Sequence, residues 1–417
     1  MPPEISIALR FLRSKRRAMI MSLTGIVFGV GFIILTQALT SGFEIFFIKT
    51  ILGTKGALRI QDKTQSTLRS IELDRIRDIK SPFTYAHSEG RKFIKGIDHP
   101  RSLVKAVKKF RNVSAVSEVI RGEVSMSNNF ITHRVSLHGI DLDNHLSVSD
   151  LEEYIMWGDL NKFRRVHNGI LIGSSLAQRM LLNIGDNVVV LAKDISHQMR
   201  VSAIYETGVS DIDRVWVFTH LDQARTLLKK PFGVSFLQVN LHDKNRAPVN
   251  ALHMSSVMGH IVESWQERER VWLDVFWALR LSSAITVSTI IIISGLGIYN
   301  TLAIIVMEKN REIAILRSIG YSRNDIGLVF IIQGMIIYLI GTFFGLILGA
   351  GMTYAVSALP IGISGIFTTD HFIVNWSIWH YAAAALTALI VVLIASYIPA
   401  RKASRLEPAV IIRGAGQ

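Results

Sequence analysis

The sequence predicts an integral membrane protein with four transmembrane α-helices and one large extracytoplasmic mixed α/β domain, inserted between the first and second helices. Three observations lead to this fold class. Hydrophobic residues make up 49% of the 417 residues and charged residues only 19%, whereas soluble chains carry about a quarter charged residues. Four long runs lack Asp, Glu, Lys and Arg altogether, and the basic residues gather in short segments beside those runs.

The four runs are long enough to cross a bilayer, whose apolar core of about 30 Å needs roughly 20 helical residues. They cover residues 18–43, 281–307, 326–358 and 378–400. The first run follows five basic residues, as in a signal peptide, but it is too long for the apolar region of one and no A-x-A cleavage site follows. We therefore interpret it as an uncleaved anchor.

The distribution of basic residues predicts the orientation. Residues 1–17, 308–325 and 401–417 hold five, four and four Lys or Arg, against five acidic residues in all, whereas residues 359–377 hold none. The positive-inside rule then places both termini and the 308–325 loop in the cytoplasm and residues 44–276 outside. Much of the formal net charge of +14 follows from this topology, and the outer segment has no nucleic-acid signature.

The expected organisation follows from these boundaries. We expect a cytoplasmic amphipathic helix (1–17), span one (18–43), the outer domain (44–276), span two (277–307), a cytoplasmic helix (308–321), span three (322–358), a short outer loop (359–377), span four (378–400) and a cytoplasmic tail (401–417).

Within the outer segment, strand and helix patterns alternate, which indicates a folded α/β domain. Residues 187–192, 199–205 and 215–219 read as strands, and residues 174–182 and 221–228 as helices. Residues 59–98 are polar and are expected to be partly mobile. Between residues 251 and 281, Trp265, Trp272, Phe276 and Leu279 recur at near-helical spacing. This spacing favours either a helix continuing span two or a helix packed on the domain core.

No motif in the chain supports catalysis. There is no phosphate-binding loop, no H-E-x-x-H pattern, no cysteine and no charged residue in the middle of a span. We therefore expect no metal site and no cofactor in this chain. A transporter built this way requires an energised partner.

The 308–325 loop offers a docking element for such a partner. It reads as a short helix with Ile313, Leu316 and Ile319 on one face and with Gly320 as its C-terminal stop. Ser322, with Asp325 three residues on, is expected to cap the next helix. The alternative is a helix that lies passively at the membrane surface.

Glycines at four-residue spacing indicate close helix packing. Span three contains Gly341, Gly345 and Gly349, and we interpret these three as a packing ridge. Span one contains Gly25 and Gly29, which we interpret as ordinary glycine enrichment of a membrane helix.

Several of these segments resemble a known protein family. Residues 308–326 (E-K-N-R-E-I-A-I-L-R-S-I-G-Y-S-R-N-D-I) and 397–408 (Y-I-P-A-R-K-A-S-R-L-E-P) are similar to the coupling helix and the C-terminal signature of the FtsX/MacB superfamily of ABC transporter permeases. Residues 8–17, 41–44, 51–53, 139–141, 169–173, 176–177 and 185–186 are similar to the Lol-type (LolC/LolE) lipoprotein-releasing permeases of that superfamily.

The resemblance implies a non-catalytic permease subunit in a bacterial inner membrane. It implies a separate LolD-like ABC ATPase that binds ATP and Mg²⁺, a second permease subunit (the same chain or a paralogue), and lipoprotein or other lipid-anchored cargo extracted by mechanotransmission. The ATPase-coupling residues it implies are Glu308, Arg311, Glu312, Ile313, Leu316, Arg317, Ile319 and Gly320.

The resemblance also implies a slot for acyl chains between the outward halves of spans one and two. In this sequence that slot would be lined by Leu35, Leu39, Phe43, Phe46, Phe47, Phe276 and Leu279. Docking of a periplasmic carrier is a further implied partnership. However, residues 227–236 form only a compact stretch where the carrier-binding relative has a protruding hairpin.

Two other functions remain open. One is an exporter of peptides, amphiphiles or glycolipids that works with an outer-membrane conduit. The other is an FtsX-like regulator of a cell-wall hydrolase, although an outer domain of more than 200 residues is large for that role.

The topology can be tested by single cysteines, because the chain has none of its own. Ser147→Cys and Ser364→Cys are expected to react with an impermeant thiol reagent from outside, and Ser322→Cys is not. The measurement is labelling in cells whose outer membrane has been permeabilised. Labelling of Ser322→Cys in such cells would overturn the orientation.

Overall fold

The computed structural model describes residues 3–14, 16–62, 96–128, 131–192, 195–360 and 371–405. These residues fold as two compact units: a helical unit, and a second unit formed between Phe46 and Leu273. Most of the 59–98 stretch expected to be mobile, part of the 359–377 loop with Ser364, and residues 406–417 of the tail lie outside the described residues.

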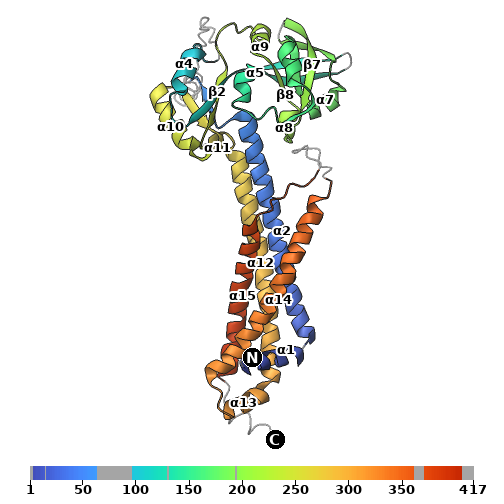
Figure 1. Cartoon of the computed structure of the whole chain (residues 1–417), viewed down its shortest axis with the longest axis vertical. Coiled ribbons are helices and arrows are strands. Elements are labelled where there is room, and N and C mark those ends of the chain that lie inside the picture. Colours follow the sequence, from blue (N-terminus) through green and yellow to red (C-terminus); the bar gives the residue numbers. More distant parts are fainter. Residues whose placement is uncertain are drawn as a thin grey trace, which may run out of the picture. The chain divides into compact units, whose positions relative to one another are not determined.

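Long apolar helices make up the helical unit (Figure 1). The described part of the chain contains four helices long and apolar enough to span a membrane, which confirms the predicted fold class. The helices of this unit are α1 (Pro3–Ser14), α2 (Arg16–Lys55), α12 (Arg270–Glu308), α13 (Asn310–Ser318), α14 (Arg323–Ser357) and α15 (Ile378–Ser404).

The glycine ridge of α14 packs directly against α2. A Cβ atom added to Gly341, Gly345 or Gly349 would lie 2.8–2.9 Å from the side chains of Ile26, Val30 and Ile34, respectively. A fourth glycine, Gly334, faces Ser396 of α15 even more closely. Because apolar side chains gain little by leaving lipid, such close approach is what membrane helices use to associate.

The interpretation of Gly25 and Gly29 as ordinary enrichment is wrong. Both glycines of α2 lie against Ser294 of α12, and a Cβ atom added to Gly29 would lie 3.3 Å from the Ser294 hydroxyl. That hydroxyl donates a hydrogen bond of 2.8 Å to the carbonyl oxygen of Gly25. The small residues therefore admit an interhelical hydrogen bond, which a lone glycine pair in a sequence does not reveal.

The second unit is an α/β domain built on a ten-stranded sheet in the order β10-β1-β9-β2-β3-β8-β5-β7-β4, and β6 pairs with both β2 and β7. Most neighbours are antiparallel, but β3 with β8 and β5 with β7 are parallel. The strands are β1 (Leu58–Gln61), β2 (Val113–Ser127), β3 (Thr132–Ile140), β4 (Ile155–Gly158), β5 (Gly169–Gly173), β6 (Asn187–Ala192), β7 (Ile195–Tyr205), β8 (Trp216–His220), β9 (Phe236–Leu241) and β10 (Ile261–Ser264).

Short helices connect these strands. They are α4 (Pro100–Val107), α5 (Leu142–Leu146), α6 (Leu160–Arg165), α7 (Ser174–Met180), α8 (Ser210–Asp213), α9 (Leu221–Leu227), the 3₁₀ helix η1 (Lys244–Arg246), α10 (Ala247–Met258) and α11 (Trp265–Arg268). The strands and helices predicted between residues 174 and 228 are all present. Between α9 and β9, the stretch 228–235 turns tightly, with positive φ at Lys229 and Gly233.

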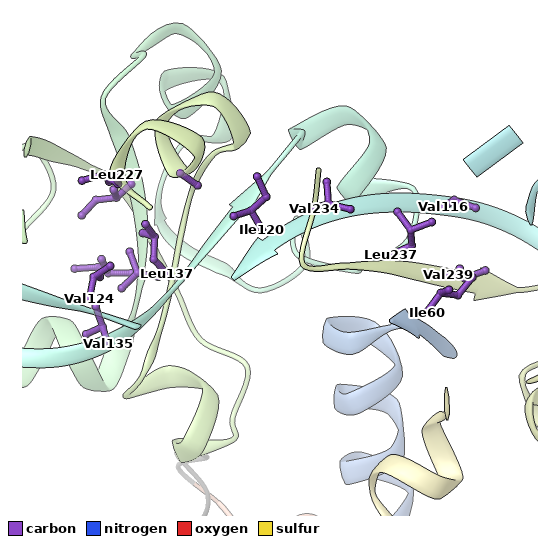
Figure 2. Close-up of a cluster of buried hydrophobic side chains, with 14 of the residues drawn as sticks. Ile60, Val116, Ile120, Val124, Val135, Leu137, Leu227, Val234, Leu237 and Val239 are labelled. Carbon is purple, nitrogen blue, oxygen red and sulfur yellow. The ribbon is translucent and has the colours of Figure 1, made fainter. Parts of the chain in front are cut away.

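The long strand β2 organises the core of this domain. Its first half pairs with β9 and its second half with β3. Figure 2 shows Val116, Ile120 and Val124 of this strand among buried side chains from the neighbouring strands, such as Val135 and Leu237. Alternate residues of each strand thus bury one apolar face of the sheet.

The expectation of one helix across the four aromatic and apolar positions between residues 251 and 281 is wrong at its N-terminal end. Residues Ile261–Ser264 form β10, Trp265 belongs to the separate helix α11, and α12 begins at Arg270. The physical reason is a capping box, because Ser264 and Glu267 satisfy each other's backbone N–H groups and start a new helix. Residues 59–61 are likewise β1 rather than part of a mobile stretch.

The contact between α14 and α2 predicts a difference between two glycines of one helix. Gly345→Ala places its methyl group 2.8 Å from Val30, so it is expected to destabilise the protein by about 1–3 kcal/mol through overpacking. Gly351 has no atom within 4 Å of an added Cβ, so Gly351→Ala is expected to be neutral or stabilising by up to about 1 kcal/mol. Unfolding by SDS in mixed micelles measures both, and equal midpoints for the two variants would contradict the packing.

Candidate functional site

The candidate coupling site is the short helix α13 between α12 and α14. Lys309 separates α12 from α13, and Ile313 donates its backbone N–H to the Lys309 carbonyl oxygen at 2.9 Å. The helix ends in a Schellman motif, in which Tyr321 N–H bonds to Leu316 O (3.2 Å) and Gly320 N–H to Arg317 O (3.3 Å). Gly320 has φ +116°, so its predicted role as the helix stop is confirmed.

The next helix begins where the sequence predicts. Ser322 accepts a hydrogen bond from the backbone N–H of Asp325, and the Asp325 carboxylate accepts one from the backbone N–H of Ser322 at 2.8 Å. This capping box makes the turn between α13 and α14 short and rigid.

Side chains of α13 also attach it to the other helices of its unit. Arg317 donates a hydrogen bond of 3.1 Å from Nη1 to the carbonyl oxygen of Ser404, at the end of α15. Lys309 pairs with Glu312 and places its ammonium group 5.6 Å from the ring centroid of Phe11 in α1. The helix is thus held at both ends and on one side.

The apolar residues of α13 divide into two groups. Ile313 is 1% exposed and packs into the core of the helical unit, together with the partly buried Leu316. Ile315 and Ile319 are 44% and 73% exposed, and they lie one turn apart. Of the predicted apolar coupling residues, the structure therefore presents Ile319 outward and keeps Ile313 inside.

Ile315 was missed by the sequence analysis, although its four-residue spacing to Ile319 was a usable signal. The charged residues Glu308, Arg311 and Glu312 are exposed beside this pair. The outward face of α13 therefore combines two apolar side chains with both signs of charge.

The predicted cargo residues of the helical unit differ in accessibility. Leu35 and Phe276 are buried, at 8% and 4% exposed, whereas Leu279 is 51% exposed. Leu39 and Phe43 are half-buried. Only part of the predicted set is therefore open to a ligand in this conformation.

The segment before α15 covers one side of α2 around residues 38–42. Asn375 donates its backbone N–H to Ala38 O at 3.0 Å, and the Ser41 hydroxyl lies 3.0 Å from Nε2 of His380. Gly42 has no room for a side chain, because an added Cβ would lie 2.5 Å from Ile373 O. Any acyl chain near Phe43 must therefore approach from another side of α2.

An apolar cleft lies among α2, α12 and α15. On α2 it is lined by residues that precede the predicted slot in the sequence. Its walls include Ile26, Ile33, Ile291, Ile298 and Val391. A hydrogen bond of 2.6 Å between the hydroxyls of Ser22 and Thr301 joins α2 and α12. The predicted cargo residues are not among the described residues that line this cleft.

Phe46 and Phe47 belong to the second unit. Phe47 is buried, and its ring centroid lies 5.0 Å from that of Trp272. The contact between the rings of Phe47 and Trp272 therefore lies within the second unit.

Family comparisons agree with this architecture. The MacB-like periplasmic core domain model matches residues 19–251, more than half of the chain, and the FtsX-like permease C-terminal model matches residues 284–408. The chain belongs to the FtsX/MacB superfamily of ABC transporter permeases, as its motifs predict.

Relatives within that superfamily match over nearly the full chain. The chain is 23% identical over 444 aligned residues to the lipoprotein-releasing system transmembrane protein LolC of Xylella fastidiosa, covering 99% of both chains. It is 22% identical to LolE of Haemophilus influenzae, covering 76% of this chain and 81% of that one. The periplasmic region of MacB from Actinobacillus actinomycetemcomitans matches 53% of this chain and 94% of its own, at 10% identity and a TM-score of 0.33.

Proposed function

We propose that the chain is the permease subunit of a Lol-type ABC transporter, in which a separate LolD-like ATPase drives extraction of lipoprotein or other lipid-anchored cargo from the outer leaflet of a bacterial inner membrane. The observation that carries the proposal is the outward face of α13, an apolar pair with flanking charges on a helix held at both ends. Full-length similarity to lipoprotein-releasing permeases supports the class of cargo.

The proposed docking contact resembles a small interface hot spot. Ile315 and Ile319 would enter an apolar groove of the ATPase, with Leu316 beside them, while Glu308, Arg311 and Glu312 would orient the helix by charge. Ile313 and Arg317 would act from inside, because they fix α13 to its own unit, and Gly320 would act by ending the helix. ATP and Mg²⁺ would be bound by the partner and not by this chain.

Transmission of force requires that α13 does not swing freely. The Schellman motif, the capping box and the hydrogen bond from Arg317 to the end of α15 supply that stiffness. A movement of α13 would then be passed to α12, α14 and α15 together. Work is needed on the other side of the membrane, because each acyl CH₂ withdrawn from lipid costs about 0.8 kcal/mol.

We expect Ile319→Asp to weaken association with the ATPase, because it places a charge at an exposed apolar anchor. The loss is expected to be about 2 kcal/mol or more, about thirtyfold in affinity. Ser318→Asp is the matched control, since it adds the same charge to a neighbouring exposed position. Co-purification and the melting temperature of each variant are the measurements. Wild-type retention of the ATPase by a folded Ile319→Asp variant would contradict the docking face.

A second experiment tests the cargo. Photoreactive residues at Phe43 and at the exposed Leu279 are expected to capture lipidated protein, and this capture should disappear when the ATPase is supplied with ATP. A photoreactive residue at Ile347, an exposed position of α14, is the control and should capture only phospholipid. If all three positions capture phospholipid alone, with or without ATP, the cargo assignment is wrong.

A further inference from the structure

The α/β domain contains a cavity of about 290 Å³ that none of the predicted sites uses. Its floor is the sheet face opposite the apolar core. On β2, Ile120 and Val124 point into the core, whereas Val119 and Arg121 line the cavity. Because side chains alternate along a strand, one face of the sheet packs into the apolar core and the other lines the cavity.

The same alternation holds on the neighbouring strands. Core residues Ile60, Leu137, Val217 and Leu237 stand beside cavity residues in their own strands. Those cavity residues are Arg59, His138, Trp216, Phe218, Phe236 and Gln238. A buried sheet face that carries basic and aromatic side chains is not explained by packing.

The cavity is strongly positive. Four cations line it, namely Lys55, Arg59, Arg121 and Arg268, and the one carboxylate among the described lining residues is Glu269. Two of these cations share Glu269, because its Oε1 lies 2.8 Å from Lys55 Nζ and 3.3 Å from Arg268 Nε. Arg121 Nη2 also lies 3.6 Å from the exposed carboxylate of Glu123, which does not line the cavity. Within the cavity wall, four cations therefore face one carboxylate.

The cations repel one another. Burial, together with the charges of Arg268 and Arg121, lowers the pKa of the Arg59 guanidinium to about 10, against an opposing effect of Glu263. Burial lowers the pKa of Arg268, and the attraction and hydrogen bond of Glu269 only partly oppose this shift. An anion in the cavity would relieve both the repulsion and the lost hydration.

Two buried polar atoms at the cavity have no partner among the described residues: Nε of Arg59 and Nε2 of His145. Burial lowers the pKa of His145 to about 4, and burial with the nearby Arg121 lowers that of His138 to about 3. Both imidazoles are therefore neutral at pH 7 and can bond a ligand without adding charge. Unpaired buried polar atoms are rare because leaving them so is costly.

Aromatic rings form the other part of the wall. The Arg59 guanidinium lies 4.0 Å from the ring centroid of Phe236, and Lys55 Nζ lies 6.0 Å from that of Trp216. The His138 ring lies 4.3 Å from the Trp216 ring. This wall suits the apolar or glycerol part of a ligand whose charged part meets the cations.

We propose that this cavity is a binding site for a phosphate monoester that carries an apolar or glycerol portion, with the phosphate held by Arg59, Arg121 and Arg268. A dianionic phosphate brings two negative charges to a wall in which cations outnumber carboxylates, and guanidinium groups bind phosphate oxygens in pairs. The ligand can be a soluble phosphate ester or the headgroup of an anionic lipid. The site does not depend on the proposed transport function.

The experiment uses the full-length protein in nanodiscs of phosphatidylcholine. Glycerol 3-phosphate is titrated by calorimetry at constant ionic strength, and in a second arm the nanodiscs contain phosphatidic acid and retained lipid is identified by native mass spectrometry. Binding in the first arm identifies a soluble ester, and retention of phosphatidic acid in the second identifies a lipid headgroup. Either result supports the site if it passes the variant test below.

Arg59→Gln is expected to weaken the binding observed by about tenfold or more, as for loss of a charge-assisted hydrogen bond. Arg121→Gln, whose side chain is 41% exposed at the rim, should act in the same direction if Arg59→Gln does not fold. Arg179→Gln removes an equal charge from an exposed position of α7 and should change nothing. The proposal is overturned if neither ligand binds, or if the cavity variants and Arg179→Gln bind alike.

Discussion

The close approach of α14 to α2 is the contact on which the helical unit depends. Lipid offers apolar side chains nearly the same environment as the protein does, so helices in a membrane are held by packing and hydrogen bonds instead. Gly341, Gly345 and Gly349 let Ile26, Val30 and Ile34 approach at distances that any larger residue would prevent. The hydrogen bond from Ser294 to Gly25 secures α12 to the same helix. Thus α2 is the element against which two other spans are placed, and its small residues are as necessary as its apolar ones.

Much of this fold could be predicted because bilayer physics imposes a strong pattern. Runs of more than 20 residues without charge, with basic flanks, have few interpretations other than spans. The cap at Ser322 and the stop at Gly320 were equally readable, since both are local and chemical. What could not be predicted was whether a given apolar residue faces its own unit or a partner. Ile313 and Ile319 are chemically identical, and only the three-dimensional packing shows that one is buried and the other exposed.

The α/β domain illustrates a second limit. Its cationic cavity draws residues from β1, β2, β3, β8 and β9, and its whole lining, from Lys55 to Glu269, is spread over more than 200 positions of the chain. Each strand contributes only one or two basic or aromatic residues at alternate positions, a pattern that in the sequence looks like the solvated side of an ordinary strand. Only the pairing order of the sheet, in which β2 lies between β9 and β3, brings these residues to one face. The pairing of β6 with both β2 and β7 is likewise a non-local feature that no short sequence motif predicts.

Stiffness connects these features to the proposed mechanism. The helix α2 continues without a break from Arg16 to Lys55, and α12 from Arg270 to Glu308. Within the α/β domain, Lys55 at the end of the first helix bonds Glu269, immediately before the start of the second. The two helices are therefore linked by an ion pair at their domain ends and by the Ser22–Thr301 hydrogen bond in the helical unit. In the proposed mechanism, a force applied at α13 would enter α12 directly through the chain, and the ion pair would couple α2 to that movement. Glu269 is also the one carboxylate among the described residues that line the cationic cavity, so the ion pair that links the two helices forms part of the wall of the proposed anion site.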